Sequence, residues 1–557
     1  MTLRSSNRRI RLLLALSVLV FAGTLARAVW LQGVQAGTLE RMASRQQRVT
    51  IEIPAGRGTI FDRTGEPLAI GEQATTVYAD PRQIQDPRRV AIAAARALDL
   101  DSNRLYEQLA DRSRHFVYVK RKADPVQAAV LERKNLAGLG FYTEELRTYP
   151  QRGVAAHVLG FAGVDNRGLD GLERSLDGSL AGKPGSETIV KDPLGRPIAV
   201  TETRPEQHGK DVVLTLDHRL QAQAEQVLRE TVRSSGAKAG TAIVLDPLTG
   251  AVLAMATAPG FDLNRFAKAS ADRRRNRAVT DTYEPGSTFK VVTVSAALSE
   301  KLVSPTTPFT LPTSIQVADR VIHEHEPRAT ELMTVAQILS QSSNVGTITL
   351  AQLLGQVRLI DWIGRFGFGK PSGVDSPGES RGILPSYWSG STIGNVPIGQ
   401  GIAVTPIQMA AAYAAIANDG VLRTPYLVER IDGKRPRRGL GRRVVSRTVA
   451  AQVMTMLRDV VSAEGGTGAA AAVPGYTVAG KTGTAAKPDK GGYSTSRYVA
   501  SFVGIVPAKE PRLVVLVSID EPKTAIWGGV VAAPAFSRIA QYGLQELEVA
   551  PDALTRR

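Results

Sequence analysis

The stretch Glu284–Lys290 reads Glu-Pro-Gly-Ser-Thr-Phe-Lys, and a nearly all-apolar segment follows it as far as Leu298. Pro and Gly break whatever precedes them, so the pattern predicts a buried helix that begins at the serine. Ser287 and Lys290 then lie one turn apart on the same face. A hydroxyl within reach of an amine is the nucleophile-and-base pair of covalent catalysis, and a helix N-terminus supplies free N–H groups where an oxyanion forms. The S-x-x-K spacing by itself is weak evidence, because Ser and Lys are common residues.

Two later stretches strengthen this interpretation. The triplet Ser342–Asn344 (Ser-Ser-Asn) begins 55 residues after Ser287, and the tetrapeptide Lys481–Thr484 (Lys-Thr-Gly-Thr) begins a further 139 residues on. S-x-x-K, S-D-N and K-T-G are the signature set of penicillin-binding proteins and class A β-lactamases. All three occur here in that order, with Ser in the middle position of the second motif, as S-x-N. The joint order and spacing resemble the penicillin-recognising serine transpeptidases.

A further box narrows the resemblance. Residues Arg57–Gly65 read as a Gly-rich turn, a short strand and another turn, and they resemble the R-G-x-I-x-D-R-x-G box that opens the non-catalytic module of class B penicillin-binding proteins. Asp62 and Arg63 are interpreted as an ion-paired turn, and His157 as a packing histidine rather than a base. The resemblance runs from about residue 50 to residue 540 and is closest to the monofunctional, cell-division (septal) type.

The second half of the chain predicts an α+β domain. Strands at both ends with helices between them favour an antiparallel sheet that is closed by the two ends of the domain and packed on helices. The expected strands are 242–246, 252–256, 502–507 and 513–517, and the expected helices are 289–299, 334–355, 405–418 and 447–462. The resemblance implies the same arrangement, namely the penicillin-binding transpeptidase or serine β-lactamase-like fold.

The N-terminus predicts a membrane anchor. Residues 1–11 are basic and 12–34 are mostly apolar, which indicates a cytoplasmic tail and a transmembrane helix. An uncleaved anchor is favoured over a removed signal peptide, because no convincing cleavage site is present. The other expected boundaries are a non-catalytic, dimerisation-like pedestal over 35–230 (with a polar helical stalk over 35–50 and helices at 88–110 and 124–136), a transpeptidase domain over 231–546 and a C-terminal tail over 547–557.

Composition excludes several functions. The 557-residue chain has a net charge of +17, but its aromatic content is only 5% and it has no nucleic-acid motif, so no nucleic-acid partner is expected. The absence of cysteine excludes disulfides and thiolate zinc sites. His323–Glu326 holds metal-capable side chains without a third placed ligand, so neither a metal nor a cofactor is expected. The basic run 434–443 is interpreted as a solvated loop.

A rival motif overlaps the third signature box. Gly475–Thr482 matches the phosphate-loop pattern G-x-x-x-x-G-K-[ST], which would indicate a nucleotide triphosphatase. A phosphate loop needs a strand before it and a helix after it. Here a Gly/Ala-rich stretch precedes it, and Gly483, Pro488 and a Gly pair follow it and forbid a sustained helix. We therefore expect 475–484 to form a strand edge.

The resemblance implies a role for each residue of the three boxes. Ser287 is the nucleophile, and Lys290 is the favoured base, with a pKa that burial and the neighbouring cation Lys481 depress. Ser342 relays a proton to the leaving nitrogen, and Asn344 holds Lys290 and the substrate amide. The remaining expectations are carboxylate binding by Lys481 and Thr482, a peptide-binding strand edge that includes Gly483, and an oxyanion hole made of the backbone N–H groups of Ser287 and Thr484.

The implied activity is D,D-transpeptidation of peptidoglycan stem peptides that end in D-Ala-D-Ala, with β-lactams as acylating inhibitors. An elongation-type transpeptidase, a penicillin sensor or scaffold without turnover, and a β-lactamase are the alternatives. The expected partners are a polytopic membrane glycosyltransferase and other divisome proteins. The expected location is the bacterial cytoplasmic (inner) membrane, with a single pass and the catalytic domain on the periplasmic side.

Overall fold

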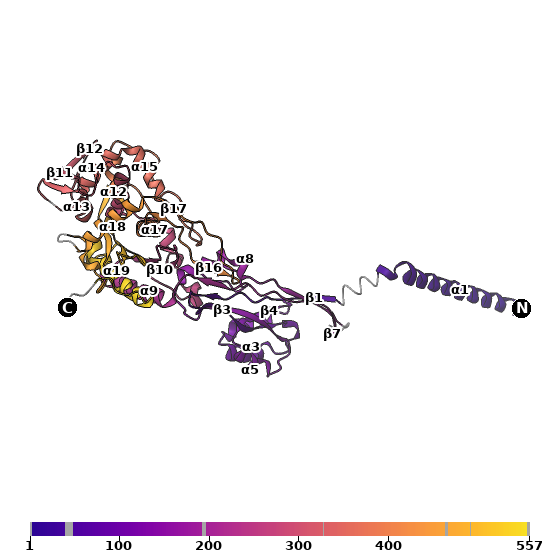
Figure 1. Ribbon diagram of the computed structural model, residues 1–557. Helices are drawn as coiled ribbons and strands as arrows, with labels where there is room; N and C mark the ends of the chain where they lie inside the picture. The colour runs from indigo at the N-terminus through magenta and orange to yellow at the C-terminus, as the bar shows by residue number, and fades with distance from the viewer. Residues whose placement is uncertain are drawn as a thin grey trace. The chain divides into compact units, whose positions relative to one another are not determined.

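The chain forms two compact units in the computed structural model, which describes residues 3–38, 48–191, 197–326, 328–462, 466–490 and 492–553 (Figure 1). The N-terminal unit comprises residues 1–56 with 182–208, and the main unit comprises residues 57–181 with 209–557.

The N-terminal unit holds an apolar helix and a small sheet. Helix α1 (Leu3–Val29) continues into a π-helical segment at Trp30–Val34. Among the described residues, Asn7–Val34 is the one helical stretch that is long and apolar enough to cross a membrane, in agreement with the predicted anchor. The antiparallel sheet has the order β1-β6-β7, with strands Arg48–Ile53, Gly185–Lys191 and Pro197–Arg204. The helical stalk predicted over 35–50 is wrong at residues 48–50, because strand β1 begins at Arg48. Residues 39–47 of the predicted stalk lie outside the described residues.

The first part of the main unit is built on the long strand β3 (Pro67–Ala79). It pairs with β2 (Ile60–Phe61), β4 (Val117–Ala123) and β5 (Leu139–Thr148), all antiparallel. The neighbouring helices are α3 (Pro87–Leu98), α4 (Ser102–Ala110) and α5 (Pro125–Glu132); α3 and α5 are labelled near β3 and β4 in Figure 1. Their apolar faces form a separate small core with β3 and β4.

The helical period predicted over 88–110 is confirmed, but the segment is divided into two helices. Asp99 adopts a left-handed conformation with φ 55° and ends α3. Asp101 then caps α4, since its carboxylate accepts hydrogen bonds from the N–H groups of Asn103 and Arg104. Asp is a strong N-cap residue and tolerates the left-handed region. One helix therefore ends and another begins within this stretch, and the apolar period does not reveal the break.

A buried charge cluster forms around Glu173. Its carboxylate accepts hydrogen bonds from the Nε atoms of Arg57 (2.6 Å) and Arg147 (2.7 Å), and all three side chains are almost fully buried. Arg57 also bonds Asp177 at 2.6 Å. The expected ion-paired turn is present, because Asp62 binds His218 (2.6 Å) and Arg63 lies 3.6 Å from Asp217.

His157 is the packing histidine that the sequence indicates. Its Nε2 lies 3.0 Å from the carbonyl oxygen of Arg273, and its ring packs edge-on against Phe261. Burial lowers its pKa to about 4.

The second part of the main unit is organised by a five-stranded antiparallel sheet of order β10-β9-β20-β19-β18. The strands are β9 (Ala239–Leu245), β10 (Val252–Ala258), β18 (Ala479–Asp489), β19 (Gly492–Val506) and β20 (Leu513–Asp520). The two ends of the domain therefore close one sheet, which confirms the predicted α+β arrangement. β18 lies at one edge, so the expected strand edge is confirmed from Ala479 onward, whereas Gly475 lies before it with φ 82°.

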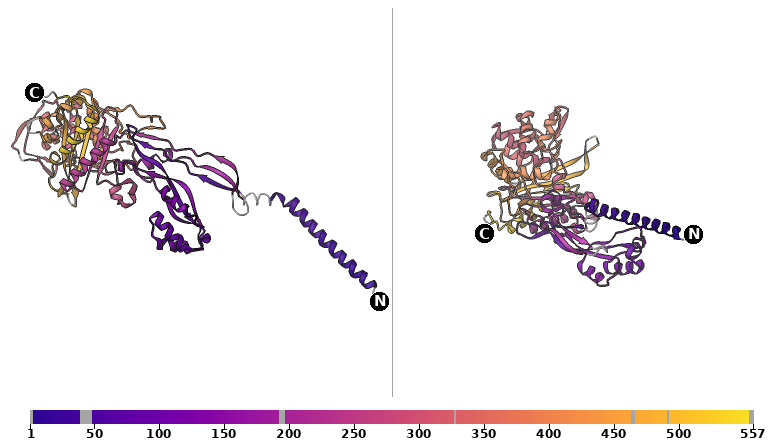
Figure 2. Two further views of the ribbon diagram at one scale, coloured as in Figure 1. Left: turned by 90° about the horizontal axis from the view of Figure 1, so that it is seen from below. Right: turned by 90° about the vertical axis from the view of Figure 1, so that its right-hand side faces the viewer.

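Helices cover both faces of this sheet. One face packs on α9 (His218–Ser235) and α19 (Gly528–Glu546), through side chains such as Leu228 and Phe536. The other face packs on a larger core that includes α12 (Lys290–Ser299), α17 (Pro406–Ala417) and α18 (Arg447–Ser462). Every residue of α17 is buried, as expected of a helix that is apolar on all sides. Figures 1 and 2 show the two helix layers around the sheet.

The predicted helix over 334–355 is also wrong. It is α13 (Val335–Ser340) followed by α14 (Asn344–Leu354). Ser342 has φ 61°, and the hydroxyl of Ser343 caps α14 by accepting the N–H of Gly346. The break places the S-x-N triplet in a turn at the start of helix α14.

The sequence did not indicate α15 (Gln356–Arg365) or α19. The basic segment 434–441 is exposed, as expected of a solvated loop. The remaining short elements are α6 (Ala156–Leu159), α7 (Gly171–Ser175), α8 (Asp177–Leu180), α10 (Ala271–Arg274), α11 (Arg277–Thr280), α16 (Thr392–Asn395), β8 (Val212–Leu214), β11 (Pro308–Leu311), β12 (Ser314–Val317), β13 (Arg320–His323), β14 (Glu331–Thr334), β15 (Val421–Leu422), β16 (Val428–Ile431) and β17 (Arg442–Arg443).

We predict that Glu173→Gln lowers the free energy of unfolding by about 3–5 kcal/mol, because it leaves two buried guanidinium groups facing a neutral amide. Thermal unfolding of the full-length protein measures the effect. The matched control is Glu230→Gln, which removes an exposed pair with Arg538 and leaves the midpoint unchanged. Equal midpoints for both variants would contradict the importance of the buried cluster.

Candidate active site

Ser287 lies in a 3₁₀ turn, Gly286–Phe289, that leads into the buried helix α12. Gly286 has φ 55°, and a Cβ atom there would lie 3.2 Å from the carbonyl oxygen of Thr484. The close approach of β18 and the left-handed backbone both require glycine at this position. Two further hydrogen bonds fix the turn. The N–H of Gly286 donates to the carbonyl of Gly399 (3.0 Å), and the hydroxyl of Tyr413 donates to the carbonyl of Thr288 (2.9 Å).

Lys290 lies fully buried at the start of α12 and brings two of the sequence boxes together. Its Nζ donates to the carbonyl oxygen of Ser342 (2.6 Å) and to Oδ1 of Asn344 (2.7 Å), and lies 3.3 Å from Oγ of Ser342. Burial lowers the pKa of Lys290 well below its usual value, and the nearby charge of Lys481 lowers it further. Both effects favour the neutral amine over the charged one.

Lys481 is also fully buried, near the start of strand β18. Its Nζ lies 3.3 Å from the hydroxyl oxygen of Thr482 and 3.4 Å from the carbonyl oxygen of the same residue. Burial lowers its pKa to about 7. Two lysines thus share one buried region, in agreement with the predicted depression of the Lys290 pKa by a neighbouring cation.

The three boxes open onto one cleft of about 820 Å³. Its walls include Ser287, Ser342, Asn344, Thr482 and Thr484. A cleft of this size accepts a small organic ligand or a short peptide. The structure therefore gathers the sequence-predicted residues at one place, with Lys290 and Lys481 buried behind it.

Strand β18 forms one wall of the cleft. A Cβ atom at Gly483 would lie 2.5 Å from Oγ of Ser501 and 3.0 Å from the carbonyl oxygen of Pro285, so the strand can approach the turn that carries Ser287 only with glycine there. The hydroxyl of Thr484 accepts the N–H of Gly528 (3.1 Å), and the Thr467 and Thr482 hydroxyl oxygens lie 2.8 Å apart.

Glu324 is the residue of this site that the sequence did not reveal. Its carboxylate accepts the N–H of Asn344 (2.7 Å), the N–H of Val345 (3.3 Å) and the hydroxyl of Ser343. Glu324 therefore binds the N-terminus of α14, which is a favourable place for an anion. The same hydrogen bonds orient the S-x-N triplet. Its charge raises the pKa of Lys290, opposing the effect of burial.

The signal for Glu324 was present in the His323–Glu326 segment, which the sequence suggested only as a weak metal site. The described residues contain no cluster of three or more His, Cys, Asp or Glu side chains that could hold a metal ion. His325 instead packs edge-on against Trp527, with ring centroids 4.5 Å apart at the cleft.

Comparison with known proteins identifies the family. The family model described as the penicillin-binding protein transpeptidase domain matches residues 240–541, and that of the penicillin-binding protein dimerisation domain matches residues 52–214. The chain is 34% identical to the peptidoglycan D,D-transpeptidase FtsI of Escherichia coli, over 98% of this chain and 93% of the relative. It is also 34% identical to the probable peptidoglycan D,D-transpeptidase PenA of Neisseria meningitidis, over 98% and 94%.

Solved structures agree. Penicillin-binding protein 3 of Mycobacterium tuberculosis, complexed with aztreonam, superposes with a TM-score of 0.71 at 33% identity and covers 90% of this chain and 98% of its own. The chain belongs to the class B penicillin-binding proteins, which are serine-type peptidoglycan D,D-transpeptidases. The phosphate-loop interpretation of Gly475–Thr482 is excluded, since Lys481 and Thr482 lie in strand β18 of this fold.

We predict that Glu324→Gln lowers the rate of acylation at least about tenfold, because the amide cannot accept both N–H groups at the start of α14. The rising limb of the pH–rate profile moves to lower pH, since removal of this carboxylate lowers the pKa of Lys290. Acylation kinetics measured across pH test both effects. The control is Asp319→Asn, the same change of charge on an exposed turn. A profile that keeps its position would contradict the electrostatic role of Glu324.

Proposed function

We propose that this protein cross-links peptidoglycan stem peptides during septal wall synthesis, through an acyl-enzyme on Ser287. The observation that best supports this reaction is the buried amine of Lys290, which lies one turn after Ser287 and is hydrogen-bonded to Ser342 and Asn344. The names of the relatives support the reaction, and the relative FtsI supports the septal type. The established family supplies the substrate class, a peptide that ends in D-Ala-D-Ala, and β-lactams as inhibitors.

Acylation begins when Oγ of Ser287 attacks the carbonyl carbon between the two alanines. Lys290, as the neutral amine, takes the hydroxyl proton, and the backbone N–H groups of Ser287 and Thr484 bind the oxyanion. The C–N bond then breaks, and Ser342 passes a proton from Lys290 to the leaving D-Ala nitrogen. Asn344 holds the Lys290 amine and the substrate amide during these transfers.

Transpeptidation completes the reaction. The amine of a second stem peptide attacks the acyl-enzyme, the ester bond breaks and Ser287 regains its proton. Lys481 and Thr482 bind the terminal carboxylate of the donor, or the carboxylate of a β-lactam. Gly483 keeps β18 close to the nucleophile turn, so that an extended donor peptide pairs along the strand edge as an added strand.

We propose that the boundary between the pedestal and the catalytic domain lies before helix α9. The boundary expected at residue 230 falls inside α9, and the apolar face of α9 packs against the catalytic sheet together with α19. The catalytic domain therefore begins before His218, and the pedestal ends there. The tail after residue 546 continues from α19.

The location follows from the anchor. The apolar helix of residues 7–34 suits a single pass through the cytoplasmic membrane, and the arginines before it favour a cytoplasmic N-terminus by the positive-inside rule. The pedestal and the catalytic domain then lie on the periplasmic side, where the substrate is. A polytopic membrane glycosyltransferase and other divisome proteins are the partners that such an enzyme requires.

We predict that penicillin labels Ser287 alone and that the adduct is long-lived, because the opened ring keeps its leaving nitrogen tethered. Intact-mass spectrometry of the full-length protein with peptide mapping tests this. Ser287→Ala removes the label, whereas Ser295→Ala, at a buried serine of the following helix α12, keeps it. A label elsewhere would refute the proposal, and an adduct lost within seconds would favour a β-lactamase.

We predict that Lys290→Arg abolishes acylation at every pH, because a guanidinium stays protonated and cannot act as a base. In the unmodified protein, the acylation rate constant rises with pH as Lys290 loses its proton. It falls again around pH 7 as Lys481, with its pKa of about 7, loses the charge that attracts the carboxylate. Stopped-flow kinetics measure the profile. Lys509→Arg, at an exposed lysine, is the control, and activity in folded Lys290→Arg would overturn the assignment.

A further inference from the structure

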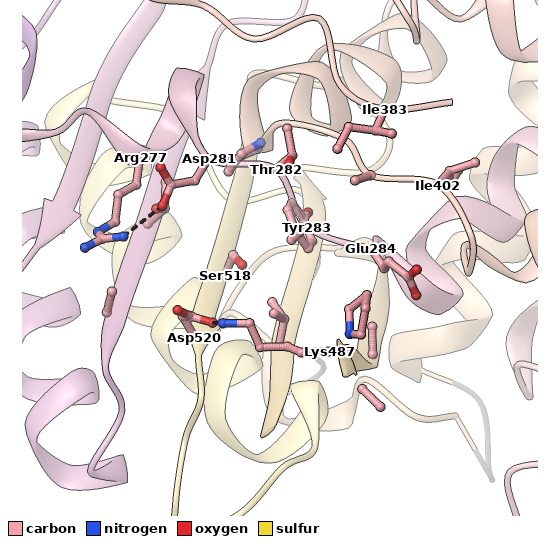
Figure 3. A pocket seen from close by; sticks show the side chains of 18 of the residues that line it. Arg277, Asp281, Thr282, Tyr283, Glu284, Ile383, Ile402, Lys487, Ser518 and Asp520 are labelled. Atoms are coloured by element: carbon pink, nitrogen blue, oxygen red, sulfur yellow. Dashed lines mark hydrogen bonds and ion pairs between the residues drawn. The ribbon is translucent and has the colours of Figure 1, made fainter. Parts of the chain in front are cut away.

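A second cavity of about 440 Å³ lies beside the segment that carries the nucleophile, and it shares no lining residue with the active-site cleft. Tyr283 and Glu284 line it just before the nucleophile turn. Figure 3 shows the ion pair of Arg277 and Asp281 on one wall, Lys487 near Asp520 on another, and Ile383 and Ile402 on a third. Its volume is that of a small-molecule site.

Two polar atoms at this cavity have no hydrogen-bond partner among the residues that the structure describes. Glu284 Oε1 accepts the N–H of Gly401 (3.0 Å) and the hydroxyl of Tyr493 (3.2 Å). The other carboxylate oxygen, Oε2, and the hydroxyl of Tyr283 are buried and have no hydrogen-bond partner within the described part of the chain. Burial raises the pKa of Glu284. A buried acceptor without a donor costs free energy, so a donor supplied by a ligand would be favoured here.

The charges at the cavity favour a positively charged ligand over a negatively charged one. Arg277 is paired with Asp281 at 2.8 Å, and Lys487 with Asp520 at 2.7 Å. Each of these cations also has a second carboxylate partner. The described lining therefore offers no unpaired cation to an anionic ligand, whereas Glu284 has no cationic partner among the described residues. A cation gains a charge-assisted hydrogen bond here, whereas the two lining cations that an anion would need are already paired with carboxylates.

Apolar side chains form a large part of the remaining wall, beside the hydroxyl groups of Thr241, Thr282 and Ser518. Ile383, Ile402, Ala403, Ala485 and Val499 line the cavity, and the Ile383 side chain is 63% exposed. A flat apolar body that covers this surface removes it from water, which stabilises the complex. The cavity thus combines an apolar wall with one unsatisfied carboxylate oxygen.

We propose that this cavity is a second ligand site, which binds a small molecule with an amidinium or ammonium head against Glu284 and a flat apolar body against Ile383 and Ile402. The proposal does not depend on the reaction proposed for Ser287, because the two sites have separate linings. The hydroxyl of Tyr283 supplies or accepts a second hydrogen bond.

Three isosteric probes test the ligand class: benzamidine, benzamide and benzoate. Saturation-transfer NMR titrations use the full-length protein in lipid nanodiscs, with empty nanodiscs as background. We expect benzamidine to bind with a Kd on the order of 1 mM, about tenfold tighter than either analogue. Equal affinities for the three probes, or a preference for benzoate, would overturn the proposal.

Variants locate the site. Glu284→Gln removes the preference for benzamidine, whereas the control Glu510→Gln, at an exposed residue, keeps it. Ala403→Phe fills the cavity and abolishes binding, whereas Ala451→Phe, on the exposed face of α18, does not. The probe series and Ala403→Phe decide the question if Glu284→Gln does not fold.

A final experiment distinguishes binding at this cavity from binding at the active site. Protein fully acylated by penicillin is expected to bind benzamidine as tightly as untreated protein. Loss of benzamidine binding on acylation, or its retention in Ala403→Phe, would place the probe elsewhere and reject the second site.

Discussion

The site depends on a buried amine that is hydrogen-bonded only to neutral oxygens within the described structure. Nζ of Lys290 contacts a backbone carbonyl, an amide oxygen and a hydroxyl oxygen. A carboxylate in contact would hold the proton on the amine, whereas neutral acceptors fix its position and leave its charge free to change. The nearest organising carboxylate, Glu324, is bonded to the backbone of Asn344 instead. It thus positions the partner of the lysine without becoming the partner itself.

The fold supplies this environment by bringing distant segments together. The sheet is closed by strands from both ends of the domain, and the helices that lie between them in the sequence cover one face. Lys290 comes from a helix start in that layer, the S-x-N triplet from a turn between two helices, and Lys481 from the edge strand. Burial of the two lysines is therefore a consequence of closing the sheet over the helical layer, and it lowers both pKa values.

Much of this arrangement could be predicted from the sequence, because apolar runs and the three boxes report local structure. The errors have local causes as well. Left-handed backbone at Asp99 and Ser342 divides two expected helices, and an apolar period continues through such a break. Helix α19 contains Gly528, Gly529 and Pro534, which read as helix breakers until the packing of its apolar face against the sheet is known.

The role of Glu324 could not be predicted for a different reason. Its partners lie about 20 residues further along the chain, and no periodicity links a carboxylate in a turn to the N-terminus of a later helix. The anchor, by contrast, needed only composition and length.

The edge position of β18 has a consequence for which chains can add to the sheet. An exposed strand edge accepts any extended polypeptide, which makes it a hazard for self-association. Here the register shifts between Ala486 and Pro488, and proline cannot donate to a ladder. Beyond this point the hairpin carries Asp489 and Lys490, which disfavour sheet extension. These features end the regular strand edge near Ala486, so the length over which another extended chain could pair with β18 is limited.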